Sequence, residues 1–242
     1  MSTHADLGMN RTGVATSPRL TAEMIEGQKE FTPDLLGDER KIAASRSSST
    51  REWTEPLGSV PPPPTLKGMV KSGLTALKGE SPTLLIDKLG ARLAFERTGV
   101  RLYEAMLAKL DAKGSFAGGP TRADIEGIVR DEYNHFQMLQ EALEHLGADP
   151  TVMTPSADIE ATITAGALAV MVEPRTDLAQ CLESALTAEL IDNDCWESIA
   201  LLAKQAGQND MAARFERALA QEQAHLLNVR RWIRVSQGLE EA

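Results

Sequence analysis

The strongest constraint on the fold is an apolar stripe of helical spacing that recurs in four segments of the chain, each interrupted near its middle by acidic residues. Side chains three or four positions apart lie on one face of a helix, so each stripe predicts an amphipathic helix with one buried face. The stripes are Leu85, Leu89, Leu93, Val100, Tyr103, Leu107 and Leu110; Ile125, Ile128, Leu139, Leu143 and Leu146; Leu178, Leu182, Ala185, Trp196 and Ile199; and Met211, Phe215, Ala218, Val229 and Trp232. Packing four such helices together would bring the acidic interruptions into the interior.

Capping residues mark the ends of these helices. Ser81, which precedes a proline, fits the start of the first helix, and Thr121 fits the cap of the second, which we expect to end at Gly147. The connection over 148–176 contains three prolines and a short helical segment near 157–171. Its length is sufficient for a crossover along a bundle. We therefore expect an all-α protein, an antiparallel four-helix bundle with a long crossover between helices 2 and 3.

Composition supports helices packed on helices and argues against some partners. Hydrophobic residues make up 42% of the chain but aromatic residues only 4%, which favours helices over sheets. Residues 1–80 hold ten acids and ten bases, so the formal net charge of −10 belongs entirely to residues 81–242, with 35 − 10 = 25 acids and 25 − 10 = 15 bases. An acidic domain repels phosphate groups, so we expect no nucleic acid and no membrane as partners.

The cysteines indicate a reducing compartment. Cys181 and Cys195 are fourteen residues apart on one expected helix, which separates them by about 21 Å and prevents a disulfide between them. The chain shows no CxxC pair, no apolar run near 18 residues and no cleavable apolar leader. These features together predict a cytoplasmic protein.

The N-terminal third has a different character. Residues 1–80 are expected to form an irregular arm, rich in Ser, Thr, Gly and Pro up to about residue 64, with a short amphipathic helix near 65–78. We expect this arm to dock on its own bundle or on a partner, because three lysines are weak support for a helix on a membrane surface. Residues 81–242 form the bundle domain.

Two of the four histidines repeat one motif, Glu-x-x-His, on matching helices. Glu132 with His135 and Glu222 with His225 each interrupt an apolar stripe, and "IEGIVRDEYNHFQML" aligns with "FERALAQEQAHLLNV" as an internal two-helix repeat. One such pair arises easily by chance, whereas two in register on aligned stripes indicate a shared site. The alternative is that these residues are solvated polar side chains on the helix faces.

The other two helices each contribute one glutamate to the same stripe. Glu96 lies 36 residues before Glu132, and Glu189 lies 33 residues before Glu222. Glu183 is an alternative to Glu189, but it lies off the stripe and breaks this symmetry. The candidate metal ligands are Glu96, Glu132, His135, Glu189, Glu222 and His225.

Four carboxylates and two imidazoles at one level of a bundle predict a pair of cations. Buried carboxylates repel one another, so we expect raised pKa values for them in the metal-free protein. Two divalent ions would balance the four negative charges, and oxygen donors with one imidazole per ion suit iron or manganese. Zinc would bind, although nothing selects it, and calcium and magnesium rarely accept imidazole.

The segments "AFERTGVRLY", "DEYNH", "TAELIDND" and "EQAH" resemble the ferritin-like di-iron carboxylate superfamily of bacterioferritins and rubrerythrins, over about residues 82–236. The resemblance implies a ferritin-like bundle with two iron ions, for which iron–manganese and di-manganese pairs are alternatives. It also implies terminal ligands at Glu96 and Glu189, bridging ligands at Glu132 and Glu222, and nitrogen ligands at His135 and His225.

The resemblance extends to residues near the metals and also has departures. Tyr103, seven residues after Glu96, matches a tyrosine near the metals and is the catalytic candidate, while packing in the core is the alternative for it and for Trp196. Asp192 is expected to orient an imidazole. Tyr133 stands where bacterioferritins carry a haem-binding Met, so no haem is expected.

The function implied is that of a di-iron oxidoreductase, similar to a ferroxidase or peroxidase, which uses dioxygen or peroxide to oxidise Fe(II) or a small reductant. We expect a homodimer or another small homo-oligomer, since the chain lacks the fifth helix of ferritin cages. Two alternatives remain open. One is iron storage or sequestration, and the other is a structural, partner-binding bundle whose metals only brace the fold.

Overall fold

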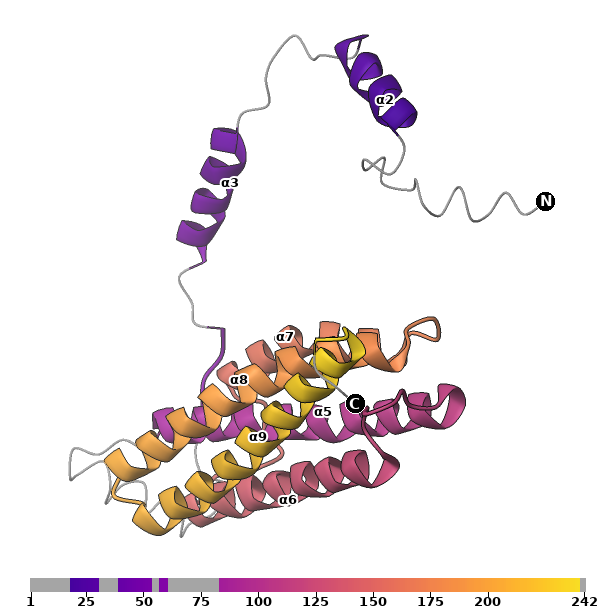
Figure 1. Cartoon of the computed structure of the whole chain (residues 1–242). Coiled ribbons are helices and arrows are strands. Elements are labelled where there is room, and N and C mark those ends of the chain that lie inside the picture. Colours follow the sequence, from indigo (N-terminus) through magenta and orange to yellow (C-terminus); the bar gives the residue numbers. More distant parts are fainter. Residues whose placement is uncertain (1–17, 31–38, 54–56, 61–82, 240–242) are drawn as a thin grey trace. The chain divides into compact units, whose positions relative to one another are not determined.

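The computed structural model describes residues 18–30, 39–53, 57–60 and 83–239, and every regular element among them is an α-helix (Figure 1). The helices are α2 (Pro18–Glu30), α3 (Glu39–Glu52), α5 (Thr83–Lys113), α6 (Arg122–Leu146), α7 (Pro155–Val172), α8 (Leu178–Gln205) and α9 (Asn209–Ser236). The prediction of an all-α protein is confirmed for these residues. No helix in these ranges has both the length and the apolar character that crossing a membrane requires.

The chain divides into two compact units between residues 55 and 56, upstream of the predicted boundary at residues 80 and 81. The difference arises because Val60 already packs against the core of the second unit and Gly58 lies 3.5 Å from Pro155, measured from the position of an added Cβ. The short helix predicted near 65–78 lies outside the described residues.

The first unit contains two helices where the sequence analysis expected irregular structure. That expectation is wrong for α2 and α3. In α2, ion pairs one turn apart join Arg19 to Glu23 at 3.1 Å and Lys29 to Glu26 at 2.7 Å. Exposed pairs of this kind support a helix without an apolar stripe, which is why a search for buried faces does not find such helices.

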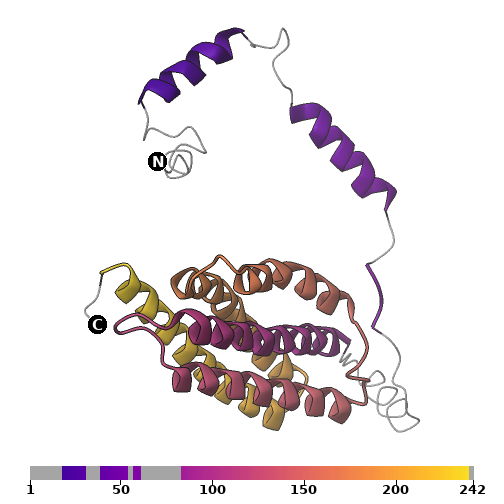
Figure 2. The same ribbon diagram turned by 90° about the vertical axis from the view of Figure 1, so that its right-hand side faces the viewer.

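The second unit is built from two helical hairpins, α5 with α6 and α8 with α9, and from α7, which packs against α5 and α8 (Figure 2). One core cluster takes residues from the first halves of α5 and α9 and the second halves of α6 and α8. The other cluster takes the opposite halves. It follows that α5 and α9 run in one direction and α6 and α8 in the other. The connection through α7 therefore runs the length of the unit.

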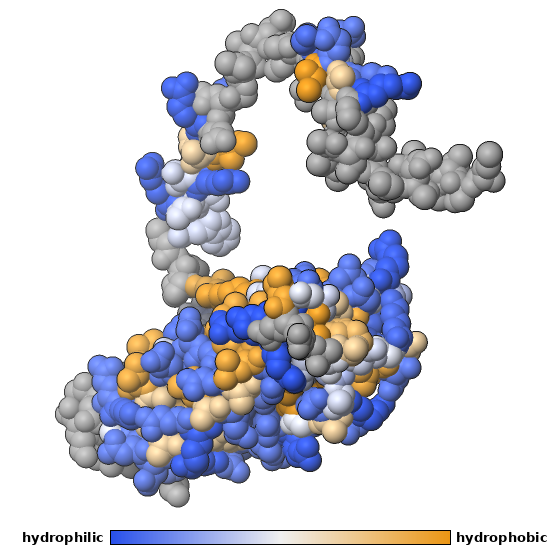
Figure 3. Space-filling model, in the orientation of Figure 1, coloured by the Kyte–Doolittle hydropathy of each residue, from blue (hydrophilic) through white to orange (hydrophobic). Residues whose placement is uncertain are grey.

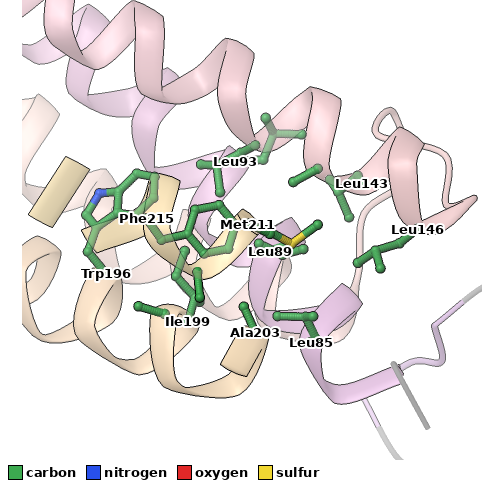
Figure 4. Packing of buried hydrophobic residues seen from close by; sticks show 14 of the residues in the cluster. Leu85, Leu89, Leu93, Leu143, Leu146, Trp196, Ile199, Ala203, Met211 and Phe215 are labelled. Carbon is green, nitrogen blue, oxygen red and sulfur yellow. The ribbon is translucent and has the colours of Figure 1, made fainter. Parts of the chain in front are cut away.

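The two core clusters fill the ends of the second unit. Figure 4 shows the first cluster, in which Trp196 of α8 meets the ring of Phe215 of α9 edge to face at a centroid distance of 5.6 Å. Trp232 of α9 and Met171 of α7 are fully buried in the second cluster. Between the two clusters lies a layer in which buried residues are polar or charged.

The capping residues predicted from the sequence define the ends of α6. Thr121 and Asp124 form a reciprocal capping box, and Gly147 ends the helix with a left-handed φ of 84°. The start of α7 is fixed by α5, because Asp87 accepts hydrogen bonds from the backbone N–H of Ser156 at 2.9 Å and from its hydroxyl at 2.5 Å. These contacts hold α7 against the hairpins.

We predict that truncation of the core is costly at Leu139 and cheap at Leu201. Leu139 is fully buried in the first core cluster, so Leu139→Ala should lower the free energy of unfolding by ~2–5 kcal/mol. Leu201 of α8 is 59% exposed, and Leu201→Ala serves as the matched control, with a change within ~0.5 kcal/mol. Urea unfolding followed by circular dichroism would measure both. Equal losses would contradict the assignment of the core.

Candidate metal centre

The six predicted ligand residues lie in the polar layer between the two core clusters. Glu96 comes from α5, Glu189 from α8, and one Glu-x-x-His pair from each of α6 and α9. None of the six is more than 4% exposed. Glu183, the alternative to Glu189, is exposed on α8. The four helices thus bring together the residues that interrupt their apolar stripes. Because all six side chains are buried, they are not solvated polar residues on the helix faces, which was the alternative interpretation.

The ligand atoms form overlapping groups whose members all approach within 4.8 Å of one another. One group contains Glu132, Glu189, Glu222 and His225, a second contains Glu96, His135 and Glu222, and a third contains Glu96, Glu132, Asp192 and Glu222. Each histidine therefore belongs to a different group, and Glu222 belongs to all of them. Glu96 and Glu132 are each shared by two groups. Carboxylates shared between groups could lie between neighbouring ions.

His135 and Glu222 approach each other closely, but their atoms are not aligned as in a hydrogen bond. The Nδ1 atom of His135 lies 2.6 Å from Oε1 of Glu222 and 3.6 Å from Oε2 of Glu96. These three atoms are buried and make no well-directed hydrogen bond within the described part of the chain. Donor atoms that converge without facing each other are positioned for a common third partner.

Each of the four glutamates carries one buried oxygen that lacks a hydrogen-bond partner among the described residues. These oxygens are Oε2 of Glu96, Oε2 of Glu132, Oε2 of Glu189 and Oε1 of Glu222. Unpartnered buried acceptors are rare in proteins, and each requires an explanation. A pair of divalent cations would satisfy all four oxygens and both imidazoles, so the residues present fit a dinuclear metal centre.

The outer nitrogen of each imidazole is held by the residue that precedes the Glu of the other repeat. Nε2 of His135 lies 3.1 Å from Oε1 of Gln221, and Nε2 of His225 lies 3.3 Å from Oδ2 of Asp131. Both partners accept hydrogen bonds, so Nε2 of each ring carries a proton and donates it outward, while Nδ1 is directed into the layer. The sequence analysis missed Asp131 and Gln221, although both occupy the same position in the two aligned repeats.

Asp192 does not have the role that the sequence predicted. It binds Arg92, whose Nη2 also lies 2.9 Å from Oε1 of Glu96. The outer partners of the imidazoles are instead Asp131 and Gln221, because residue 192 faces α5. Burial raises the pKa of Asp192 well above its usual value, although Arg92 opposes this.

Arg92 is a buried cation that the sequence analysis missed. It is 1% exposed, and its guanidinium lies 4.1 Å from the centre of the Phe95 ring. Arg92 lies one turn before Glu96 and is adjacent to Leu93 in sequence, but it is not part of the apolar stripe. The stripe alone therefore gave no reason to expect it to be buried. Its charge offsets part of the negative charge of the layer.

The two aromatic residues that follow the glutamates by seven positions bind glutamates across the layer. The hydroxyl of Tyr103 donates to Oε1 of Glu189, and Nε1 of Trp196 donates to Oε1 of Glu96 at 3.1 Å. Each aromatic residue thus holds the glutamate of the other hairpin. Trp196 also meets the ring of His135 edge to face, with centroids 5.2 Å apart. Both side chains pack in the core and contact the candidate centre.

Protons take the place of cations in the metal-free centre. Burial, reinforced by the charge of Glu222, raises the pKa of Glu132 well above its usual value and that of Glu189 to about 8. Burial lowers the pKa values of His135 and His225, but nearby carboxylates reverse this and raise each to about 10. The prediction of raised carboxyl pKa values is confirmed for Glu132 and Glu189.

Glu222 is the exception to that prediction. Burial would raise its pKa, but His135 and His225 flank its carboxylate and bring the pKa well below the usual range. The sequence prediction of a raised value is therefore wrong for Glu222. A carboxylate between two imidazolium rings stays ionised, because opposite charges at close range favour the charged form.

Gly99 of α5 makes room for Glu132. A Cβ added at Gly99 would lie 2.2 Å from Oε2 and 2.9 Å from Cδ of the Glu132 carboxylate. Any side chain at this position would therefore displace the carboxylate. The absence of a side chain lets α5 approach α6 at the level of the centre.

Comparisons of the chain with protein-family models, with curated proteins and with solved structures find no match. The assignment of the centre therefore rests on the identity, burial and spacing of its own residues. The observations that carry it are the unpartnered oxygens and the two imidazoles that face them.

We predict that Gly99→Ala weakens metal binding, because the new methyl group must push the Glu132 carboxylate out of place. Gly127→Ala is the matched control, since an added Cβ there meets only the end of Arg130 at 4.0 Å. Titration with Fe(II) under argon or with Mn(II) should show at least about a tenfold loss of affinity for Gly99→Ala alone. Equal affinities in the two variants would rule out Glu132 as a ligand.

We predict that the metal-free protein loses stability as the pH rises from 6.5 to 9. A group with a raised pKa stabilises the fold only while it is protonated. The contribution of His135 and His225 is complete below 6.5 and disappears toward about 10, and that of Glu189 disappears between 4.5 and about 8. Glu222 has the opposite sign, but its contribution is constant above 4.5.

Urea unfolding of the metal-free chain across this pH range measures the effect. The metal-loaded protein is the control, because bound cations replace the protons and their affinity increases with pH. A metal-free protein that is equally stable at pH 6.5 and pH 9 would contradict the proton-filled layer.

Proposed function

We propose that the chain is a ferritin-like dinuclear metal protein that binds two iron ions and uses dioxygen or peroxide to oxidise Fe(II) or another small reductant. The observation that carries the proposal is the buried layer in which four glutamates and His135 direct unpartnered ligand atoms toward one another, with Nδ1 of His225 3.0 Å from Oε2 of Glu222. Uncompensated negative charge at such a depth is costly, so cations belong there.

The grouping of the ligand atoms supports one role for each residue. Glu222 joins the group of His135 and the group of His225, as a bridging ligand would. Glu132 is proposed as the second bridge. Glu96 and Glu189 are proposed as terminal ligands, since each has one oxygen held by an aromatic side chain and the other without a partner. One imidazole per ion completes a set that suits iron, and manganese at either position would use the same donors.

The helix directions support the ferritin-like arrangement. The parallel pair α5 and α9 and the parallel pair α6 and α8 give two antiparallel hairpins, and α7 spans the unit between them. The Glu-x-x-His motifs lie on the second helix of each hairpin, as in ferritin-like di-iron proteins.

The protein residues in this proposal bind, orient and exclude water. The metal pair would supply the electrons and the open positions at which an oxidant reacts. The hydroxyl of Tyr103 donates a hydrogen bond to Glu189 and so holds this carboxylate in place, and burial together with that carboxylate raises the tyrosine pKa well above its usual value. Asp131 and Gln221 hold the imidazole rings in one orientation. The core clusters on both sides keep the layer dry.

Aerobic addition of Fe(II) to the metal-free chain tests the proposal and separates it from the two alternatives. Catalytic consumption of oxidant by a homodimer or other small oligomer supports the proposed redox function. Growth of a mineral of many irons per chain inside a large shell would instead identify a storage protein. Stoichiometric binding without oxidation would identify a metal-braced bundle.

We predict that Glu222→Gln abolishes measurable Fe(II) oxidation, because the amide is a weaker ligand for both ion positions. Glu197→Gln is the matched control on α8, where the carboxylate is exposed, and it should oxidise Fe(II) at the wild-type rate. Absorbance of Fe(III) and an oxygen electrode would follow the reaction. Unchanged oxidation by Glu222→Gln would refute the proposed centre.

A further inference from the structure

A cavity of about 370 Å³ lies between α5, α7 and α8, beside the candidate centre. Its volume falls within the range of small-molecule binding sites. Small residues at the middle of its walls leave the space open, namely Gly99 on α5, Gly166 and Ala167 on α7 and Ala188 on α8. The face that carries α7 is also rich in exposed apolar side chains, such as Ile163 and Val170 (Figure 3). The cavity opens within this apolar surface.

Three hydroxyl groups of the cavity wall already donate to helix carbonyls, while the polar side chains of Gln180 and Glu183 are exposed. The hydroxyl of Thr98 donates to the carbonyl of Ala94 at 3.0 Å, and that of Thr164 donates to Glu160 O at 2.9 Å. The hydroxyl of Ser184 donates across to α7, to Ala167 O, at 3.1 Å. These residues have used their only hydroxyl protons, so they offer a ligand little beyond methyl groups and acceptor oxygens. The wall suits an apolar molecule.

The charge at the cavity decides against an anionic ligand. Glu183 is the charged residue of the lining, and it is exposed on α8. A carboxylate on the ligand would meet this like charge and would lose its hydration without gaining a cationic partner in the lining. An uncharged molecule avoids both penalties.

Gly99 belongs to both the cavity and the centre. It lines the cavity on α5, and its Cα lies directly against the carboxylate of Glu132. Ala188 and Leu102, also in the lining, are adjacent in sequence to Glu189 and Tyr103, which face the centre. The wall that separates the cavity from the metal ligands therefore includes a residue without a side chain.

We propose that this cavity binds an uncharged, largely apolar organic molecule next to the metal centre. The chemistry of the wall selects the molecule, and the contact between Gly99 in the lining and the carboxylate of Glu132 places it on the Glu132 side of the layer. The binding of this molecule does not depend on the proposed function. A role for the molecule in the reaction of the centre does rest on that function.

Binding is tested on the full chain in its metal-free form, with 1-octanol and octanoate as matched probes. Isothermal titration should show that octanol binds at least about tenfold more tightly than octanoate, because the carboxylate meets Glu183 and loses hydration. Gly166→Leu and Ala188→Leu fill the cavity from two different helices and should each abolish octanol binding. Gly127→Ala is the control, since Gly127 lies on α6 outside the cavity lining and an added Cβ there meets only the end of Arg130 at 4.0 Å, and it should bind octanol as the wild type does.

The link to the centre has a separate readout. Octanol should slow Fe(II) oxidation saturably in the wild type and in Gly127→Ala, but not in Gly166→Leu. Octanol binding no tighter than octanoate, or unaffected by both leucine variants, would overturn the binding site. Binding without any effect on oxidation would overturn the link to the centre alone. A chain that binds octanol but does not oxidise Fe(II) would refute the proposed function and leave the binding site intact.

Discussion

The structure depends on the repulsion among carboxylates that the fold brings together in one dry layer. Glu96, Glu132, Glu189 and Glu222 would not share this space without positive charge nearby. In the metal-free chain the positive charge comes from Arg92 and from protons on the imidazoles, while other protons neutralise Glu132 and Glu189. If the proposed metal ions bind, these groups would lose their protons and the ions would supply the positive charge instead. The apolar clusters lie on both sides of the layer.

Hydrogen bonds between residues of the two hairpins follow the same pattern in both directions across this layer. Each Glu-x-x-His histidine takes its outer hydrogen-bond partner from the opposite repeat, Gln221 or Asp131. The aromatic residues behave in the same way, with Tyr103 on the glutamate of α8 and Trp196 on the glutamate of α5. Both imidazoles and two of the glutamates, Glu96 and Glu189, therefore have a hydrogen-bond partner on the opposite hairpin. This reciprocity explains why two weakly similar halves meet with their polar positions in register.

The sequence predicts the parts of this structure that depend on local spacing. The four long helices of the second unit and the six ligand residues follow from stripes whose period and interruptions are visible within single segments. Arg92 was missed and Asp192 was misassigned because their pairing joins positions 100 residues apart and depends on how α8 is rotated against α5. The large apolar residues of α2 are limited to Leu20, Met24 and Ile25, and α3 has only Ile42, so neither helix shows a stripe as long as those of the second unit. The cavity was equally invisible, because it arises from small residues on three helices whose alignment no single segment encodes.

The reciprocal contacts also bear on how such a chain is built. A hairpin made of α5 and α6 alone would present Glu96, Glu132 and His135 but would lack the group that orients its imidazole and half of the donors around it. Two copies of one hairpin related by a twofold axis would supply the missing half. The single polypeptide thus contains an internal pseudo-dimer, and α7 is the tether that joins its halves. Halves joined in one chain can differ in sequence. At equivalent positions the first half has Asp131 and Tyr103, and the second half has Gln221 and Trp196.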